Sequence, residues 1–199
     1  MLLLNNIRIN VNNKTLIENL SVSILPGSIT YVTGKNGSGK TTLLKTLANL
    51  KKPSKGEIKL YNHTLEELQK PYCLYLGHKQ GLEDSQTVLE HLKFWSKCYH
   101  SLEMVISAIK FWDLEDILEK DISELSEGQK RRVTLSKLTL CHSKLWLLDE
   151  VEVNLDQEIL KFLHYAITIK ANSGSIIFLA TNTKERIKFS QQINIEDYL

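Results

Sequence analysis

The sequence contains few cysteines and no long apolar segment. Cys73, Cys98 and Cys141 lie far apart, without the close pairing of a metal site, and their odd number argues against a disulfide framework. The apolar runs, such as residues 145–148 and 176–180, are much shorter than the ~20 residues that a membrane-spanning helix needs. We therefore expect reduced thiols and no transmembrane helix.

An excess of charge of one sign is also missing. The formal net charge is +2, and the hydrophobic fraction of 42% and charged fraction of 24% are typical of a globular protein. No strong positive field is available for nucleic acid, and we interpret the basic run 130–132 as a solvated or phosphate-facing helix turn. The N-terminal residues 1–6 lack the features of a secretory signal, so we expect a cytosolic location.

A glycine-rich loop of the form G-x-x-x-x-G-K-[ST] consists of Gly34, Lys35, Asn36, Gly37, Ser38, Gly39, Lys40 and Thr41. Such a loop turns backbone N–H groups onto phosphate oxygens, and the following helix N-terminus adds partial positive charge. We expect Lys40 to reach the β- and γ-phosphates, Thr41 to ligate Mg²⁺ and Thr42 to bond an α-phosphate. The loop alone predicts a bound nucleotide with Mg²⁺, as in many unrelated kinases, GTPases and helicases; ATP as the nucleotide is implied by the family resemblance described below.

An acidic pair, Asp149 and Glu150, follows a segment that is apolar at every position from residue 145 to residue 148. This pattern predicts a parallel strand buried on both faces, and ligands of such sheets bind at the carboxyl ends of the strands. We expect Asp149 to hold Mg²⁺ through water and Glu150 to orient or deprotonate the attacking water. An acidic pair at this place is also common as a helix cap.

The pentapeptide Leu125-Ser126-Glu127-Gly128-Gln129 has two compatible interpretations. Ser126 and Gln129 have the spacing of a capping box, which predicts the start of a helix. A serine hydroxyl and the free N–H groups of a first helical turn can also bind an anion, and Gly128 keeps the backbone accessible to a γ-phosphate.

Hydrophobic periodicity predicts an α/β domain. Strands are predicted at residues 2–9, 20–25, 29–33, 58–61, 73–76, 145–148 and 175–181, and helices at residues 40–50, 88–99, 102–111, 127–142 and 157–171. The later strands alternate with helices as in a parallel sheet, whereas the early strands, separated by polar turns, predict an antiparallel sheet. Residues from about 84 to 142 are nearly all helical in pattern and predict an insertion.

The order of the phosphate loop, the pentapeptide and the acidic pair resembles the ABC (ATP-binding cassette) ATPase family, in which the pentapeptide is the signature motif. The resemblance implies a P-loop NTPase core with an antiparallel β subdomain and a helical insertion, over residues 1–199 as one ATP-binding domain. It also implies a head-to-tail dimer with a second cassette, expected to be a second copy of this chain. Ser126, Gly128 and Gln129 would then contact ATP held by the partner, and residues 154–156 match the loop between the two sites.

Four features depart from the family pattern. Asn182 replaces the histidine that senses the γ-phosphate, and an amide cannot carry the imidazole's positive charge. The family's glutamine, which links Mg²⁺ and the attacking water to the membrane partner, is expected at Lys79, with Gln80 one residue later. Both remain candidates. Val151 replaces the proline after the catalytic glutamate, and residues 9–15 lack the aromatic side chain that stacks on adenine in many members.

Four further sequence segments look like those of the ATP-binding subunits of the haem exporter of bacterial cytochrome c maturation. They are residues 75–78, 89–94, 125–133 and 145–150. This resemblance implies integral membrane transporter subunits as partners and a peripheral position on the cytoplasmic face of the bacterial inner membrane. We expect no direct contact with haem. Leu82, Phe94 and Trp95 are candidates for docking, although a helix packed on its own core would give the same pattern.

Two further hypotheses remain open at this stage. The departures at Asn182 and Lys79 also suit an ATP-gated interaction module that binds ATP and dimerises with weak or no hydrolysis. Alternatively, the chain serves another small ABC exporter. A role in translation or DNA repair is disfavoured, because such proteins carry two linked cassettes or long coiled coils that do not fit in 199 residues.

Overall fold

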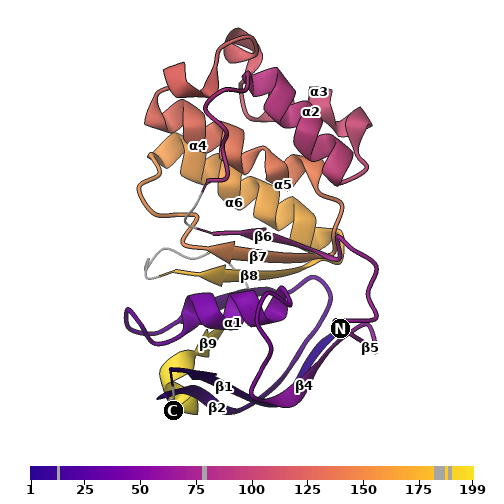
Figure 1. Ribbon diagram of the computed structural model, residues 1–199, viewed down its shortest axis with the longest axis vertical. Coiled ribbons are helices and arrows are strands. Elements are labelled where there is room, and N and C mark those ends of the chain that lie inside the picture. The colour runs from indigo at the N-terminus through magenta and orange to yellow at the C-terminus, as the bar shows by residue number, and fades with distance from the viewer. Residues whose placement is uncertain (13, 78–79, 182–186, 188–189) are drawn as a thin grey trace. The chain divides into compact units, whose positions relative to one another are not determined.

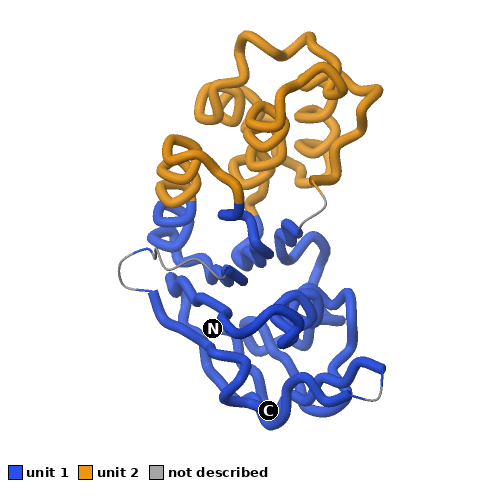
Figure 2. The backbone as a smooth tube through the Cα atoms, turned by 90° about the vertical axis from the view of Figure 1, so that its left-hand side faces the viewer, with its two compact units in different colours: residues 1–78, 143–153, 167–199 blue, residues 79–142, 154–166 orange. Residues whose placement is uncertain are grey.

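The structure is a computed structural model that describes residues 1–12, 14–77, 80–181, 187 and 190–199. The chain forms two compact units, each discontinuous in sequence (Figure 2). The first unit contains residues 1–78, 143–153 and 167–199, and the second contains residues 79–142 and 154–166. Within the described ranges, no helix has both the length and the apolar character needed to cross a bilayer.

The first unit contains a parallel sheet whose central strands are wholly buried. Its order is β6 (Cys73–Leu76), β7 (Leu145–Asp149), β8 (Ile176–Ala180), β3 (Ile29–Thr33) and β9 (Gln191–Asn194), and all neighbouring strands pair in parallel. Every residue of β7 and β8 is buried, which explains why these segments are apolar without alternation. The ends of β3 and β7 thereby reach the same edge of the sheet.

An antiparallel sheet forms the rest of the first unit. It runs in the order β2 (Lys14–Ile24), β1 (Leu2–Val11), β4 (Lys55–Leu60) and β5 (His63–Thr64). Helix α1 (Lys40–Leu47) lies between the two sheets (Figure 1), and Leu43, Leu44 and Leu47 are fully buried in one core with residues of both. Each such leucine contributes about 1.5–3 kcal/mol of burial free energy. The short helix η4 (Ile195–Tyr198) also contributes to this core.

The second unit is helical. It contains α2 (Val88–Cys98), η1 (Leu102–Met104), α3 (Val105–Phe111), η2 (Glu115–Ile117), η3 (Ile122–Glu124), α4 (Glu127–Leu135) and α5 (Lys137–Leu140). Helix α6 (Gln157–Asn172) contributes residues 157–166 to this unit and residues 167–172 to the first. A capping box of Thr87 and Glu90 starts α2. The indole Nε1 of Trp112, after α3, donates to Thr139 Oγ1 at 3.0 Å, joining two segments of the helical core.

The predicted α/β architecture with a parallel and an antiparallel sheet is confirmed, and β3 and β6 have the predicted bounds. The predicted helix 127–142 is wrong as one helix, because it divides at Ser136 into α4 and α5. The Ser136 hydroxyl donates to the carbonyl of Val133 at 2.6 Å, a bond that bends helices. The predicted strand 20–25 falls in the longer β2 except for its last residue, which lies beyond the end of β2 at Ile24, and the short strands β5 and β9 were not predicted.

Substitution of Gly56 is expected to destabilise the antiparallel sheet strongly. Gly56 in β4 has φ +90°, and an added Cβ would lie 2.5 Å from the carbonyl oxygens of Asn5 and Asn6 in β1. Gly174 has a similar φ of +82°, but an added Cβ there meets no atom within 4 Å. Gly174→Ala should therefore cost about 1–2 kcal/mol for its backbone conformation alone, and Gly56→Ala about 2–3 kcal/mol more for the steric overlap. Urea unfolding of both variants measures the difference, and equal losses would contradict it.

Candidate functional site

The phosphate loop, residues 34–41, connects the end of β3 to the start of α1. Lys40 is only 5% exposed, and its Nζ donates to the carbonyl oxygens of Gly34 at 2.7 Å and Lys35 at 3.2 Å. The hydroxyl of Ser38 is buried and has no hydrogen-bond partner among the described residues. An ammonium group, an unpaired hydroxyl and the first N–H groups of α1 form a donor set that fits phosphate oxygens.

A pocket of about 480 Å³ lies beside this loop. It is lined by Leu16, Asn36, Gly37, Gly39, Lys40, Thr41, Thr42, Glu150 and Val153. The pocket therefore collects most of the predicted phosphate loop together with the predicted catalytic glutamate. Leu16 and Val153 were not predicted, because isolated apolar residues in or beside strands and turns carry no motif. Leu16 follows directly on residues 9–15, which lack an aromatic side chain, and it supplies an apolar surface to the pocket.

Asp149 is 1% exposed at the end of β7, and each of its carboxylate oxygens accepts one hydrogen bond. The hydroxyl of Thr41 donates to Oδ1 at 3.1 Å, and the phenol of Tyr75, on the neighbouring strand β6, donates to Oδ2 at 3.2 Å. Burial, and then the charge of Asp149, raise the pKa of Tyr75, so the phenol remains a donor. Tyr75 was not predicted as a site residue; its signals were its place near the carboxyl end of a predicted parallel strand and its place in the segment 75–78 that resembles the haem-exporter subunits.

Thr41 and Asp149 suit the magnesium ion that the family implies. Mg²⁺ is usually held by one or two carboxylates together with substrate phosphates and water, and a neighbouring hydroxyl and carboxylate meet that need. No group of three or more His, Cys, Asp or Glu side chains that could hold a metal ion occurs in the part of the chain that the structure describes. Thr41 would ligate the ion directly, and Asp149 would do so through water.

Glu150 has a left-handed backbone conformation, with φ +56°. Its N–H donates to the carbonyl of Ala180, at the end of β8, at 2.8 Å, and its carbonyl accepts from Val153 N–H at 3.3 Å. A non-glycine residue in this conformation costs on the order of 1–3 kcal/mol, and such strain concentrates at functional sites. The two hydrogen bonds hold the strained residue, and its side chain lines the pocket.

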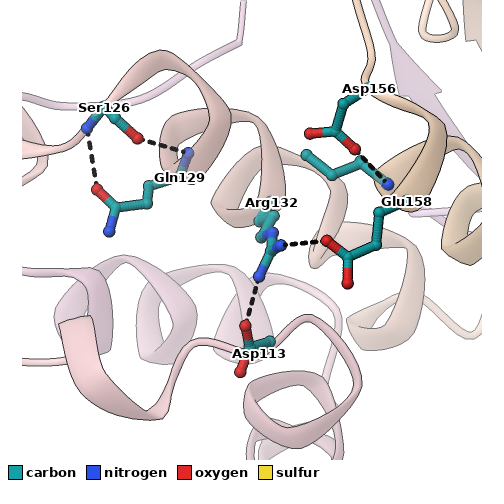
Figure 3. Close-up of polar contacts among 7 residues, drawn as sticks. Asp113, Ser126, Gln129, Arg132, Asp156 and Glu158 are labelled. Atoms are coloured by element: carbon teal, nitrogen blue, oxygen red, sulfur yellow. Dashed lines mark hydrogen bonds and ion pairs between the residues drawn. The ribbon is translucent and has the colours of Figure 1, made fainter.

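The predicted capping box of the pentapeptide is confirmed in the second unit (Figure 3). Gln129 N–H donates to the hydroxyl of Ser126 at 3.3 Å, and Ser126 N–H donates to Oε1 of Gln129 at 3.0 Å. Ser126 and Gly128 are exposed, and an added Cβ at Gly128 would meet no atom within 4 Å. The N-terminus of α4 is therefore open to a ligand from outside the described chain.

Arg132, in the last turn of α4, joins this helix to two other segments (Figure 3). Its guanidinium donates to Asp113, which follows α3, and to Glu158 in the first turn of α6, at 3.3 Å. The interpretation of residues 130–132 as a solvated or phosphate-facing turn did not include these ion pairs of Arg132 with carboxylates of the same unit. Both carboxylates are exposed, so the pairs add at most about 1 kcal/mol to the free energy of unfolding. Their main effect is to position α4 against Asp113 and Glu158.

The loop residue Asp156 caps the start of α6. Its Oδ1 accepts from the N–H of Ile159 at 2.8 Å (Figure 3).

Gln80 is half-buried in the second unit, and its backbone carbonyl accepts a hydrogen bond from Lys137. Two candidates, Lys79 and Asn182, lie outside the described residues. Of the docking candidates, Phe94 is 50% exposed, whereas Leu82 and Trp95 are half-buried.

Comparison with known proteins decides the family. A family model described as ABC transporter matches residues 17–152. The chain belongs to the ABC transporter ATP-binding family. It is 43% identical over 195 residues to the "Cytochrome c biogenesis ATP-binding export protein CcmA" of Rickettsia bellii, covering 98% of this chain and 100% of that relative. The predicted membership of the ABC ATPase family is thereby confirmed, as is the predicted function as an ATP-binding subunit of a transporter that matches the cytochrome c biogenesis export proteins.

Solved structures confirm the predicted fold. A putative ABC transporter ATP-binding protein from Pyrococcus furiosus has a TM-score of 0.84 at 25% identity, covering 99% of this chain and 98% of that chain. The ATP-binding cassette MJ0796, in a dimer bound to ADP and Pi, has a TM-score of 0.81 at 19% identity, covering 98% of this chain and 94% of that chain. Because the chain belongs to the ABC transporter ATP-binding family, it is a nucleotide-binding ATPase subunit. The family implies membrane partner subunits, dimeric cassettes and peripheral association with a membrane.

Removal of the Tyr75 hydroxyl is expected to weaken magnesium-dependent hydrolysis. Tyr75→Phe keeps the ring but leaves Oδ2 of Asp149 without its phenol donor. Loss of one hydrogen bond of about 1 kcal/mol should raise the Mg²⁺ concentration for half-maximal ATP hydrolysis about fivefold. Titration of the ATPase rate with Mg²⁺ measures this shift.

Tyr72→Phe is the matched control. The Tyr72 hydroxyl donates to the carbonyl of Leu47 at 3.0 Å, at the far end of α1 from the phosphate loop. The control should leave the Mg²⁺ dependence unchanged. An equal effect of both substitutions, or none from Tyr75→Phe, would show that the phenol does not orient Asp149.

Proposed function

We propose that this cassette is the ATP-hydrolysing subunit of the haem exporter of bacterial cytochrome c maturation. The observation that carries the ATPase assignment is the hydrogen bond between Thr41, at the phosphate loop, and Asp149, one residue before Glu150. The printed names of the relatives, such as the export protein of Rickettsia bellii at 43% identity, support the role in cytochrome c biogenesis.

The phosphate loop and Thr42 would bind the triphosphate of ATP. Lys40 would supply positive charge at the β- and γ-phosphates, and Thr41 and Asp149 would hold Mg²⁺. When bound, the ion neutralises charge on the phosphate oxygens. Glu150, held by Ala180 and Val153, would orient the attacking water and accept its proton. Little covalent chemistry is then required of the protein beyond positioning and charge stabilisation.

A second copy of the chain would complete the site. Ser126, Gly128 and Gln129 would contact the γ-phosphate of ATP held by the other copy, since the exposed N-terminus of α4 offers N–H groups to an anion. The dimeric cassette of similar fold, bound to ADP and Pi, supports this arrangement. Lys79, Gln80 and Asn182 remain the candidates for sensing the γ-phosphate and for coupling it to the membrane subunits.

The membrane partners would be the integral subunits of the exporter, with this cassette on the cytoplasmic face of the inner membrane. We expect no direct contact of this cassette with haem or with nucleic acid. His91 is buried in the helical unit, and His142 pairs with Glu103 at 3.2 Å, which suits structural roles for these histidines.

Hydrolysis in the assembled transporter is expected to depend on Glu150. Glu150→Gln removes the proton acceptor while keeping the shape of the side chain, so the ATPase rate should fall at least about 100-fold while ATP binding is retained. Glu57→Gln is a control, because Glu57 pairs with Lys59 in the antiparallel sheet, outside the residues that line the pocket. Steady-state ATPase assays and nucleotide titrations measure both effects.

A wild-type rate no higher than that of Glu150→Gln would remove the ATPase proposal and favour the ATP-gated interaction module. Co-purification with membrane subunits of a different exporter would retain the ATPase assignment but overturn the role in cytochrome c maturation.

A further inference from the structure

Lys137 is a buried cation outside the nucleotide pocket. Lys40 and Lys137 are the buried lysines among the described residues, at 5% and 3% exposure. Lys40 lies in the phosphate loop, but Lys137 is the first residue of α5 in the helical unit. Burial of an ammonium group costs several kcal/mol of folding free energy unless its N–H donors have partners. The partners of Lys137 therefore indicate which part of the structure this residue holds in place.

The ammonium group of Lys137 is satisfied by one loop and one aromatic ring. Nζ donates to the carbonyl oxygens of Gln80 at 2.9 Å and Gly81 at 3.3 Å. The same nitrogen lies 4.2 Å from the centroid of the Trp95 ring, on α2. Two carbonyls and a ring face match the three N–H donors of an ammonium group, and the contact with an indole is favourable for a cation.

His91 is a titratable neighbour of Lys137. His91, on α2, is 1% exposed, and its Nε2 has no hydrogen-bond partner among the described residues. Burial, and then the charge of Lys137, lower the pKa of His91 to about 4, so the imidazole is neutral near pH 7. In the part of the chain that the structure describes, the two backbone carbonyls and Trp95 hold the cation.

The Gly81 backbone permits the close approach of Lys137. Gly81 has φ +62°, and an added Cβ would lie 3.3 Å from Nζ. The loop and α5 are separated by 56 residues in sequence. One buried side chain thus fixes the backbone of Gln80 and Gly81 to the helical unit, in the same way that Lys40 bonds to carbonyls of the phosphate loop.

We propose that Lys137 is a positioning residue for Gln80: it holds the backbone of the Gln80–Gly81 segment so that the Gln80 side chain follows the helical unit during ATP hydrolysis. This inference rests on the proposed function. It also assumes that Gln80, and not the residue at position 79, performs the role of the family's glutamine that links Mg²⁺ and the attacking water to the membrane partner. Lys137 itself contacts neither ATP nor the attacking water in this role. Its removal should therefore reduce turnover without reducing nucleotide binding.

The test uses the assembled transporter with four variants: Lys137→Met, Lys137→Arg, Gln80→Ala and the double variant Lys137→Met/Gln80→Ala. Lys137→Met is expected to lower kcat about tenfold while KM for ATP stays within about twofold. Lys137→Arg should retain about half of kcat or more, because a guanidinium can donate to both carbonyls and stack on Trp95. The double variant should be no slower than Gln80→Ala, since Lys137 acts through Gln80.

Nucleotide-binding stoichiometry separates positioning from folding. If Lys137 only stabilised the fold, binding stoichiometry and kcat would fall in proportion, and the effects of the two single substitutions would multiply in the double variant. Gly81→Ala perturbs the same contact while Lys137 stays in place, and it should also lower kcat. It replaces Lys137→Met as the test if that variant proves unstable. Lys144→Met is the control, because exposed Lys144 also donates to a backbone carbonyl, that of Ser173 at 3.2 Å.

Multiplicative effects, or a normal kcat for Lys137→Met, would overturn the inference and leave the proposed function intact. A normal kcat for Gln80→Ala would do the same. A wild-type rate equal to that of Glu150→Gln would remove the proposed function and the inference together, so the two failures are distinguishable.

Discussion

Parallel pairing of buried strands determines where the chemistry of this chain lies. Strand β7 pairs with β6 on one side and β8 on the other, and β8 pairs with β3. Because all these strands run in one direction, the phosphate loop after β3 and the acidic pair after β7 reach the same edge. The bonds from Thr41 and Tyr75 to Asp149 follow from that pairing, as does the bond from Glu150 N–H to Ala180.

The polar and strained features of the two units are stabilised locally. Lys40 and Lys137 are buried cations, and each is satisfied by carbonyls of a loop. Glu150 has an unfavourable backbone conformation that is held by two backbone hydrogen bonds. These groups cost free energy that burial of the apolar strands offsets, which is the usual relation between a functional loop and its scaffold.

The sequence predicted those features that depend on local pattern. The central strands are apolar at each position because both faces are buried, and the capping box of Ser126 and Gln129 is a matter of spacing alone. Strand β9 was missed because Gln191 and Gln192 are exposed at a sheet edge and show no apolar run. Tyr75, Arg132 and Lys137 were missed because their partners are brought together only by tertiary structure. The roles of Lys79 and Asn182 stay predictions.

In the proposed function, half of the site lies on the exposed N-terminus of α4, and a second copy of the chain would provide the other half. Sedimentation velocity of the full chain carrying Glu150→Gln, with and without Mg-ATP, examines this requirement without interference from hydrolysis. A monomer without nucleotide and a dimer with Mg-ATP are expected. A chain that stays monomeric at saturating Mg-ATP, with nucleotide bound, would contradict a composite site made by two copies.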